Sequence, residues 1–391
     1  MAVNNLTFNQ LSTVLNGIVS QATGVSNITP TNTSEFVSVA QTALKTGYDP
    51  VINAVSQVLS RTIFAMRPYT RKFRGLEVDN QMYGNIVRKI NSIDKSWEND
   101  SRLTLTDGES IDQYVVNKPE IIQTNFYGAN VYQKSLTIFR DQLDNAFSGP
   151  DEFARFISLI MTNADDMIAQ AHEATARATI GNFVGGKVTA DANSVIHLLT
   201  EYNTLTGGEF TATTIYEPTN FVPFMRWVAS RINNLCAWLT ERTEKYHINL
   251  TGKPVMRHTP KADQRIYMYS PALEQINAMV KSNTYNDSYL NIAYTEGVNY
   301  WQAVNTPDQI QVKPVYLNAA DGTLTTAADN VTVSDVFGVI ADRDAMGYTI
   351  VNQWSSPTPF NAKGGYTNMF WHFTDRYWND FMENGIILLL N

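Results

Sequence analysis

The chain has 391 residues, with 29 lysines and arginines against 37 aspartates and glutamates, which gives a formal net charge of -8. This acidic balance argues against a nucleic-acid-binding protein that is held on by bulk charge. Only 17% of the residues are charged and 43% are hydrophobic, so the composition predicts a folded chain whose surface is polar more than ionic. The single cysteine, Cys236, excludes an intrachain disulfide framework.

The length suggests two or three structural units, at roughly 150 residues per domain. No apolar run approaches the ~18 residues that a membrane span needs; the longest covers only Ile386 to Leu390. The first five residues lack the basic and apolar regions of a secretory signal peptide. We therefore expect a protein without a membrane partner that is made and kept in a cytoplasm.

The first fifty residues contain only three charged side chains, Glu35, Lys45 and Asp49. This segment looks too polar for a core and too uncharged for a typical disordered arm. We expect it to lie across another surface, on its own chain or on a neighbouring one. Ser34 predicts the N-cap of a short helix through Lys45, and Asp49-Pro50 predicts a second helix that runs to about residue 65.

A concentrated positive segment follows within residues 61–74, which contain five basic residues and no acid: Arg61, Arg67, Arg71, Lys72 and Arg74. Such clusters usually form a solvated or ion-paired face. The functional interpretation is a contact with nucleic acid or with an acidic partner, and the sequence leaves both open.

Between residues 75 and 135 the pattern changes to short alternating runs, which predict strands at 85–90, 101–106, 113–116 and 120–122. Asp107-Gly108 is a hairpin turn signal between two of them. A stretch of hairpin with few large apolar residues cannot form a core alone, so we expect it to project and to pair with something else.

A long amphipathic helix is predicted over 151–182, after the break at Gly149-Pro150. Apolar residues follow the i, i+3, i+4, i+7 rule at Phe153, Phe156, Ile157, Ile160, Ala164, Met167, Ile168 and Ala171. We expect Gly181 and Gly185-Gly186 to end this helix. A second long helix is predicted from about 219 to 246, a short one over 271–281, and further strands at 265–269, 310–317, 331–340, 348–354, 369–373 and 386–390. The fold class is therefore α+β.

No chemical motif is complete. The run from Gly181 to Lys187 has the skeleton of a phosphate-binding loop, but it follows a helix rather than a strand, and Val188 replaces the hydroxyl that Mg²⁺ needs. His172-Glu173 begins a zinc-protease pattern, yet Ala176 stands where the second histidine must be. The acids of Asp342-Arg-Asp344 fit a turn as well as a metal site. We assign no catalytic, cofactor-binding or metal-binding residue.

The order of these parts resembles the Hong Kong 97-type major capsid proteins of tailed bacteriophages, and is closest to the short-tailed podovirus branch. The resemblance is carried by the segment 132–143 before Ala146-Phe147 and the long helix, and by the ending Gly338-Val-Ile-Ala-Asp-Arg-Asp344 with Met369-Phe-Trp-His-Phe373 and the last strand. It implies an N-terminal arm over 1–48, an extended loop over 75–131 and an axial domain over 215–345. Residues 49–74, 132–214 and 346–391 would form a peripheral domain around a spine helix at 151–182.

The resemblance also implies pentamers and hexamers that close an icosahedral shell around double-stranded DNA, with a scaffolding protein and a portal as partners and with DNA on the inner face. Such a shell is the virion capsid, assembled in the host bacterial cytoplasm, and no enzyme activity is implied. Candidate inter-subunit or DNA contacts are Arg61, Arg67, Arg71, Lys72, Arg74, Lys89 and Lys95. The core of the long helix would comprise Phe153, Phe156, Ile157, Ile160, Met167 and Ile168.

Some members of the family crosslink a lysine to an asparagine through a nearby glutamate, and Lys89 and Lys95 lie in the corresponding region, but no motif marks a partner. Two other functions stay open. One is a β-rich carbohydrate-binding or hydrolytic protein that uses the C-terminal aromatics, although their alternation fits a sheet core equally well. The other is a virion component outside the shell, such as a tail or decoration protein.

Overall fold

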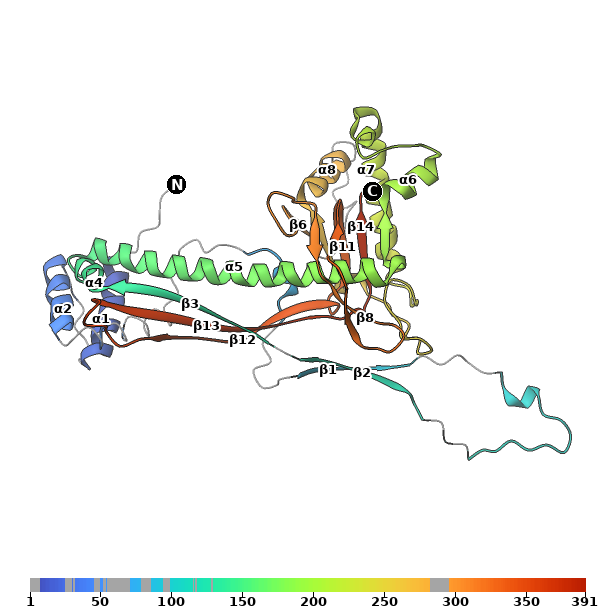
Figure 1. Cartoon of the computed structure of the whole chain (residues 1–391), viewed down its shortest axis with the longest axis horizontal. Helices are drawn as coiled ribbons and strands as arrows, with labels where there is room; N and C mark the ends of the chain where they lie inside the picture. The colour runs from blue at the N-terminus through green and yellow to red at the C-terminus, as the bar shows by residue number, and fades with distance from the viewer. Residues whose placement is uncertain are drawn as a thin grey trace.

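The computed structural model describes residues 8–24, 30, 32–45, 50–51, 54, 71–78, 86–93, 99–114, 116, 118–127, 129–281 and 295–391. One long helix, α5 (Pro150–Ala190), connects the two ends of the molecule (Figure 1). A three-stranded sheet runs beside it, two N-terminal helices cover one end, and a second sheet with its own helices stands at the other end. A thin hairpin projects away from the body.

Helix α5 has 41 residues, which corresponds to a length of about 60 Å. The sequence predicts a long helix here, but the prediction that Gly181 and Gly185-Gly186 end it is wrong. Other side chains approach the helix at these glycines: a Cβ on Gly186 would lie 2.5 Å from the ring of Phe381, and one on Gly185 would lie 2.5 Å from Val312. Gly185 and Gly186 therefore serve close packing inside the helix.

The sheet beside α5 is antiparallel with the order β12-β13-β3. It consists of β3 (Asn130–Phe139), β12 (Met346–Pro357) and β13 (Tyr366–Asn379). Strand β13 pairs along its length with both neighbours, from Phe139 opposite Tyr366 to Met346 opposite Asn379. Buried residues of this sheet include Ile138 on β3, Tyr348 on β12, and Met369 and Phe373 on β13. The strands predicted at 348–354 and 369–373 are present and longer than expected.

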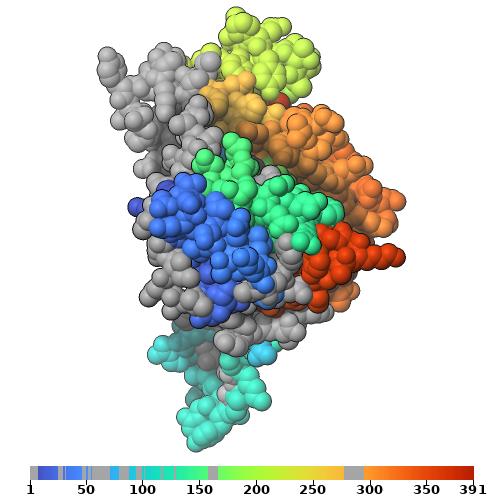
Figure 2. Space-filling model, turned by 90° about the vertical axis from the view of Figure 1, so that its left-hand side faces the viewer, coloured from blue at the N-terminus to red at the C-terminus, as the bar shows by residue number. Residues whose placement is uncertain are grey.

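The N-terminal segment folds onto its own chain, as α1 (Phe8–Thr23) and α2 (Thr33–Lys45). Figure 2 shows these helices, in blue, at one end of the molecule. Leu15, Ile18 and Phe36 are fully buried in one cluster with Phe153. The expectation that this segment is too polar for a core is therefore wrong, because its apolar residues gather on one side of each helix.

The start of α2 also differs from the prediction. Asn32 rather than Ser34 is the capping side chain, since its Oδ1 accepts a hydrogen bond of 2.9 Å from the backbone N–H of Glu35. The second helix expected to run from Pro50 to about residue 65 lies largely outside the described residues. The short helix α4 (Arg140–Ala146) follows β3 and leads into α5.

The second sheet has the order β4-β14-β11-β5-β6. Its strands are β4 (Val195–His197), β5 (Gln264–Tyr269), β6 (Thr295–Val298), β11 (Val336–Asp342) and β14 (Gly385–Leu389). Its helices are α6 (Leu198–Thr206), α7 (Pro218–Trp238) and α8 (Ser270–Lys281). Buried residues of α7, such as Phe224 and Ile232, share one core with Ile266, Ile340 and Ile386 of the sheet.

Helix α7 ends at Trp238, so its predicted extension to Tyr246 is wrong. The backbone of Tyr246 has a φ of 68°, in the left-handed region that a right-handed helix excludes. The predicted strand 331–340 is likewise divided, into β10 (Val331–Val333) and β11, because Asp335 has a φ of 57°. The predicted strand 310–317 comprises two short strands, β7 (Ile310–Val312) and β8 (Val315–Leu317).

The projecting hairpin is formed by β1 (Ile86–Ser92) and β2 (Ile121–Tyr127), paired antiparallel. The strands predicted at 101–106 and 113–116 are wrong: the described residues of the tip form the 3-10 helix η2 (Ser101–Leu103), turns and segments without regular secondary structure. The remaining elements are β9 (Leu324–Thr326), η1 (Arg74–Leu76), η3 (Ala192–Ser194), η4 (Thr214–Tyr216) and η5 (Lys261–Asp263). Strands β8 and β9 pair with each other, as do β7 and β10.

Candidate functional site

The tip of the hairpin carries large apolar side chains in solvent. Leu103 and Tyr114 are each 81% exposed and Val116 is 78% exposed. Asp107 and Gly108 form a turn in which Gly108 adopts a φ of 89° and the N–H of Glu109 donates to Thr106 O at 3.0 Å. These exposed apolar side chains on one projecting segment make the hairpin tip a candidate interaction surface.

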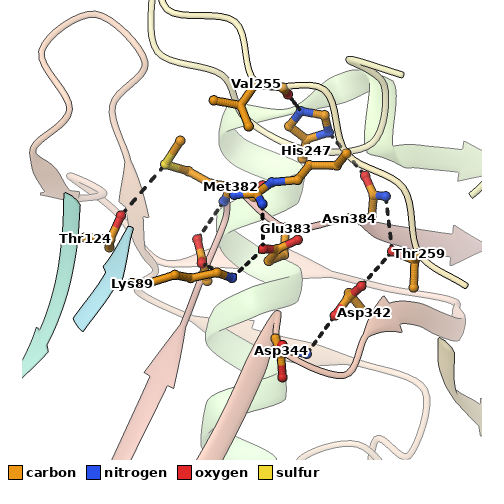
Figure 3. A network of polar contacts seen from close by, with 12 residues as sticks. Lys89, Thr124, His247, Val255, Thr259, Asp342, Asp344, Met382, Glu383 and Asn384 are labelled. Carbon is orange, nitrogen blue, oxygen red and sulfur yellow. Dashed lines mark hydrogen bonds and ion pairs between the residues drawn. The ribbon is translucent and has the colours of Figure 1, made fainter. Parts of the chain in front are cut away.

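The root of the hairpin is held by a cluster of charges, shown in Figure 3. Lys89 Nζ lies 2.9 Å from Asp380 Oδ2 and also pairs with Glu383. Arg257 Nη1 lies 3.2 Å from Glu383 Oε1 on its other side. The two carboxylate side chains are only 2% and 8% exposed, so two cations from distant parts of the chain neutralise a buried acidic pair.

This environment shifts the protonation equilibria of the cluster. Burial by itself lowers the pKa of Lys89, but the attraction of Asp380 and Glu383 outweighs it and the pKa is raised above the ordinary lysine value. Burial raises the pKa of Glu383, against the opposing effect of Lys89 and Arg257. The ammonium of Lys89 is therefore kept charged by its carboxylate partners.

A second network adjoins the first through the 380–384 turn. His247 Nε2 lies 2.7 Å from Val255 O, and its Nδ1 lies 3.2 Å from Asn384 Oδ1. Asn384 Nδ2 donates to Thr259 Oγ1 at 3.2 Å, and Thr259 Oγ1 donates to Asp342 Oδ2 at 2.7 Å (Figure 3). Burial is the main cause that lowers the pKa of His247, which favours the neutral imidazole in this position.

The predicted basic segment is described only in part, since Arg61 and Arg67 lie outside the described residues, as does Lys95. Arg71 pairs with Glu77 of the same chain, and the backbone N–H of Lys72 donates to Glu173 on α5 at 3.2 Å. Arg74 is exposed. Part of the segment thus lies on acids of its own chain, and its contact with a neighbouring subunit or with DNA stays a prediction.

The predicted core of the long helix is buried most deeply near its start. The Phe153 ring lies 5.4 Å from that of Phe147 and 5.7 Å from that of Phe36. Phe156 is half-buried against the same cluster, and Met167 and Ile168 are also half-buried. Ile157 and Ile160 lie within α5, but their side chains are outside the described set.

The motifs rejected from the sequence have structural roles in the described parts of the chain. The phosphate-loop skeleton lies inside α5, where the buried Lys187 pairs with Asp191 at 3.0 Å. His172 Nδ1 lies 3.1 Å from Asp375 Oδ2 and Glu173 pairs with Arg177, so neither side chain faces a zinc site. Asp342 Oδ1 accepts the N–H of Asp344 at 2.8 Å, as in a turn.

Three further observations concern chemistry. Burial raises the pKa of Cys236 to about 12, which keeps it a thiol. The described residues include no group of three or more metal-ligating side chains placed to hold an ion. A pocket of about 840 Å³ beside the hairpin root is lined by Asn91, Arg257, Arg343 and Asp344, among others; Arg257 and Arg343 are both paired with acids.

Of the charge cluster at the hairpin root, sequence reasoning found only Lys89. Asp380, Glu383 and Arg257 carry no local sequence signal, because each of them pairs with a residue more than a hundred positions away in the chain.

Within the described residues, no helix combines the length and the apolar character needed to cross a bilayer.

Comparison with known proteins gives both a family and a fold. The model of the Phi29-like phage major capsid protein family matches residues 11–389. A chain of the capsid structure of Staphylococcus phage Andhra is similar, with a TM-score of 0.56 and 10% identity, over 84% of this chain and 87% of that one. A chain in the structure of the head fiber and inner core protein gp22 of native bacteriophage P68 is similar over the same shares, with a TM-score of 0.57 and 10% identity. No curated protein matches the sequence.

Proposed function

Because this chain belongs to the family of Phi29-like phage major capsid proteins, we propose that copies of it associate as pentamers and hexamers into an icosahedral shell around double-stranded DNA. The α+β Hong Kong 97-type fold implied by the sequence resemblance is confirmed by the likeness to phage capsid structures. The family assignment selects a virion capsid protein over the two alternatives that the sequence left open.

The apolar hairpin tip is the observation that carries the assembly proposal. Leu103, Tyr114 and Val116 lie in solvent on a segment that projects from the body (Figure 1). Burying such side chains on another copy is favourable by about 25 cal/mol per Å² of apolar surface. A closed shell repeats one contact many times, so each contact can be modest.

The proposed division of the subunit follows the resemblance. Residues 1–48 form the N-terminal arm, 75–131 the extended loop and 215–345 the axial domain. The peripheral domain comprises 49–74, 132–214 and 346–391. In the described part of the arm, α1 and α2 pack on their own subunit. Contacts between the arm and other subunits would therefore be made by residues outside those helices or by the outer faces of the helices.

The partners of the shell are also proposals. We assign the protein a structural role without catalysis, a scaffolding protein and a portal as helpers in the host bacterial cytoplasm, and packaged DNA on the inner face. The short-tailed podovirus branch is the proposed origin. The net charge of -8 suits a subunit that encloses DNA without gripping it strongly. Arg61, Arg67, Arg71, Lys72 and Arg74 remain the proposed local contact with DNA or with an acidic neighbour.

The test is assembly of the full-length chain, alone and with the scaffolding protein of its phage. We expect sedimentation velocity and negative-stain microscopy to show particles that grow with concentration and have fivefold and sixfold units. The triple variant Leu103→Ser, Tyr114→Ser, Val116→Ser should keep its circular dichroism and lose most of this assembly. A wild-type chain that stays monomeric in both settings would refute the proposal, and rings, tubes or trimers would indicate another virion component.

A further inference from the structure

Both strands of the hairpin contact the same turn of the body, the one between β13 and β14, through residues that lie opposite each other in the hairpin. Lys89 on β1 and Thr124 on β2 are direct partners in the hairpin register. Lys89 pairs with Asp380 and Glu383, and Thr124 Oγ1 lies 4.0 Å from the sulfur of Met382 (Figure 3). These three body residues belong to the turn between β13 and β14, so a single short segment receives the root of the hairpin.

That turn is fixed to several other elements. The Phe381 ring stacks on Phe183 of α5, with centroids 5.6 Å apart and an interplanar angle of 7°. Phe381 O accepts the N–H of Ile248 at 2.9 Å, and the N–H of Asp380 donates to Ala345 O at 2.7 Å. The turn is therefore a rigid support, and whatever binds to it takes a defined position relative to α5 and both main sheets.

Besides these two contacts, the hairpin buries the side chain of Asn91, which is 8% exposed. Its two strands form a separate two-stranded sheet, and Ile90 and Ile121 are 57% and 59% exposed. A two-stranded hairpin of this kind is only marginally stable by itself in water. In the described part of the chain, the ion pairs from these strands to the body come from Lys89.

The charge balance makes the Lys89 contact specific. Asp380 and Glu383 are almost fully buried, and Arg257 supplies one further cation next to Glu383. Lys187 also attracts both carboxylates but is itself paired with Asp191. Without Lys89, Asp380 would lose the ion-pair partner that the structure shows for it, and an unpaired buried charge is strongly unfavourable. The hairpin root is therefore driven to return to this one position whenever it swings away.

We propose that Lys89 is a positioning residue for shell assembly, which sets the direction of the hairpin by clamping β1 to Asp380 and Glu383. This inference rests on the proposed function, because the direction matters only if the tip must meet another copy. Up to about 60 Å of extended chain separates Lys89 from Gly108. Even a small tilt at the root would therefore carry Leu103 and Tyr114 away from a fixed docking surface.

The same strand offers a matched control. Arg88 is the next residue, carries the same charge, and is exposed on the opposite face of β1. Replacement of either residue by methionine removes one positive charge from the hairpin root, but only Lys89→Met breaks the clamp. Lys89→Arg keeps the charge near the two carboxylates and should restore the function.

The direct test measures the hairpin direction in the unassembled full-length subunit. Spin labels are attached to Ser110→Cys at the tip and Thr200→Cys on α6, with the buried Cys236 left in place. Double electron–electron resonance then measures the distribution of distances between the two labels. We expect Lys89→Met to broaden or shift the distribution, while Lys89→Arg and Arg88→Met keep the wild-type one. Assembled mass should fall at least tenfold for Lys89→Met alone. Wild-type distances and assembly in Lys89→Met would overturn the proposal.

Two outcomes need a second measurement. If Lys89→Met loses its circular dichroism, the double variant Lys89→Met, Asp380→Asn removes one carboxylate together with the cation and leaves Glu383 paired with Arg257. A folded double variant that keeps the wild-type tip distance and assembly would also overturn the clamp. If the wild type and Arg88→Met both fail to assemble, the proposed function fails, while the distance measurement on the subunit still decides whether Lys89 positions the hairpin.

Discussion

Replacement of Gly186 by alanine tests why α5 continues through its glycines. In a helix interior, alanine is more favourable than glycine by about 1 kcal/mol. At this position, however, the new Cβ would lie 2.5 Å from Cε1 and 2.6 Å from Cζ of Phe381. Overpacking a filled core costs about 1–3 kcal/mol. The net expectation is a free energy of unfolding that is lower by up to about 2 kcal/mol.

Gly181 provides the matched control one and a half turns earlier in the same helix. A Cβ there would meet the nearest atom, Cγ2 of Ile310, at 3.5 Å, which is an ordinary van der Waals contact. Gly181→Ala should therefore benefit from the higher helix propensity of alanine and raise the free energy of unfolding by up to about 1 kcal/mol. The two variants make the same chemical change and differ only in what the methyl group meets.

The assay is urea unfolding of the full-length unassembled chain, followed by far-UV circular dichroism and tryptophan fluorescence. Midpoints are compared at equal slope, so that a shift reports stability. Opposite signs for the two variants support the reasoning. If Gly186→Ala stabilises the chain as much as Gly181→Ala does, the ring of Phe381 yields freely and the turn that carries Asp380 and Glu383 is not held by close packing on α5.

Three further changes have defined outcomes. Phe153→Ala removes a fully buried ring from the cluster with Phe36, and urea unfolding should report a loss of about 3–5 kcal/mol. Deletion of residues 1–48 removes α1 and α2 from that cluster, so the truncated chain should bind a hydrophobic dye and scatter light, and a dye-free stable monomer would contradict this packing. The pKa of His247 is lowered from 6.5 mainly by burial, with an opposing contribution from its hydrogen bonds. The unfolded chain then binds the proton more tightly, so the stabilisation is complete above about pH 6.5 and is lost as the pH falls through the lower folded-state pKa. His247→Gln should flatten the decrease in melting temperature between about pH 7.5 and 5.

Elements with a strong local pattern could be predicted from the sequence. The stripe that begins at Phe153 and Phe156 lies in one long helix, because its apolar residues repeat at the helical period. The short apolar runs around Arg265–Tyr269 and Ile386–Leu390 lie in strands, because runs of that length are typical of buried strands. The failure at Gly181 and Gly186 has a physical reason. A glycine can end a helix or admit a close neighbour, and at Gly186 that neighbour is Phe381, almost two hundred residues away. Gly181 has no such close neighbour, and the helix simply continues through it.

One prediction about the N-terminal segment failed for a different reason. Leu11, Val14, Leu15 and Ile18 have helical spacing and are buried on one face of α1, so the signal was present in the sequence. The expectation that the segment lies across another surface, on its own chain or on a neighbouring one, agrees with its packing against Phe153. What is wrong is the inference from low charge that it is too polar for a core, because uncharged polar residues such as Asn and Ser suit the outer face of a helix as well. Periodicity was the better guide there than composition.

The charge cluster at the hairpin root could not have been found from local patterns. Lys89 is separated from Asp380 and Glu383 by 291 and 294 positions, and a lone lysine on an alternating strand normally marks a solvated face. Only the return of the C-terminal strand between the two sheets brings the acids under the hairpin. The fold therefore decides which of the few charges of this chain are buried.

The tip of the hairpin supplies attraction between copies, and the root of the hairpin fixes its direction. Apolar contacts at the tip are non-directional, so they supply attraction between copies but cannot fix an angle. A lysine between two buried carboxylates neutralises them in one geometry only, and any other position leaves buried carboxylate charge without its partner, so the contact fixes an angle without adding attraction between copies. A shell needs both attraction and a fixed direction. Each of its many equivalent contacts must be weak enough for a misplaced subunit to dissociate, and the hairpin must still have the same direction in every subunit. Placing Lys89 at the root and Leu103 and Tyr114 at the tip of one hairpin meets both requirements within a single segment.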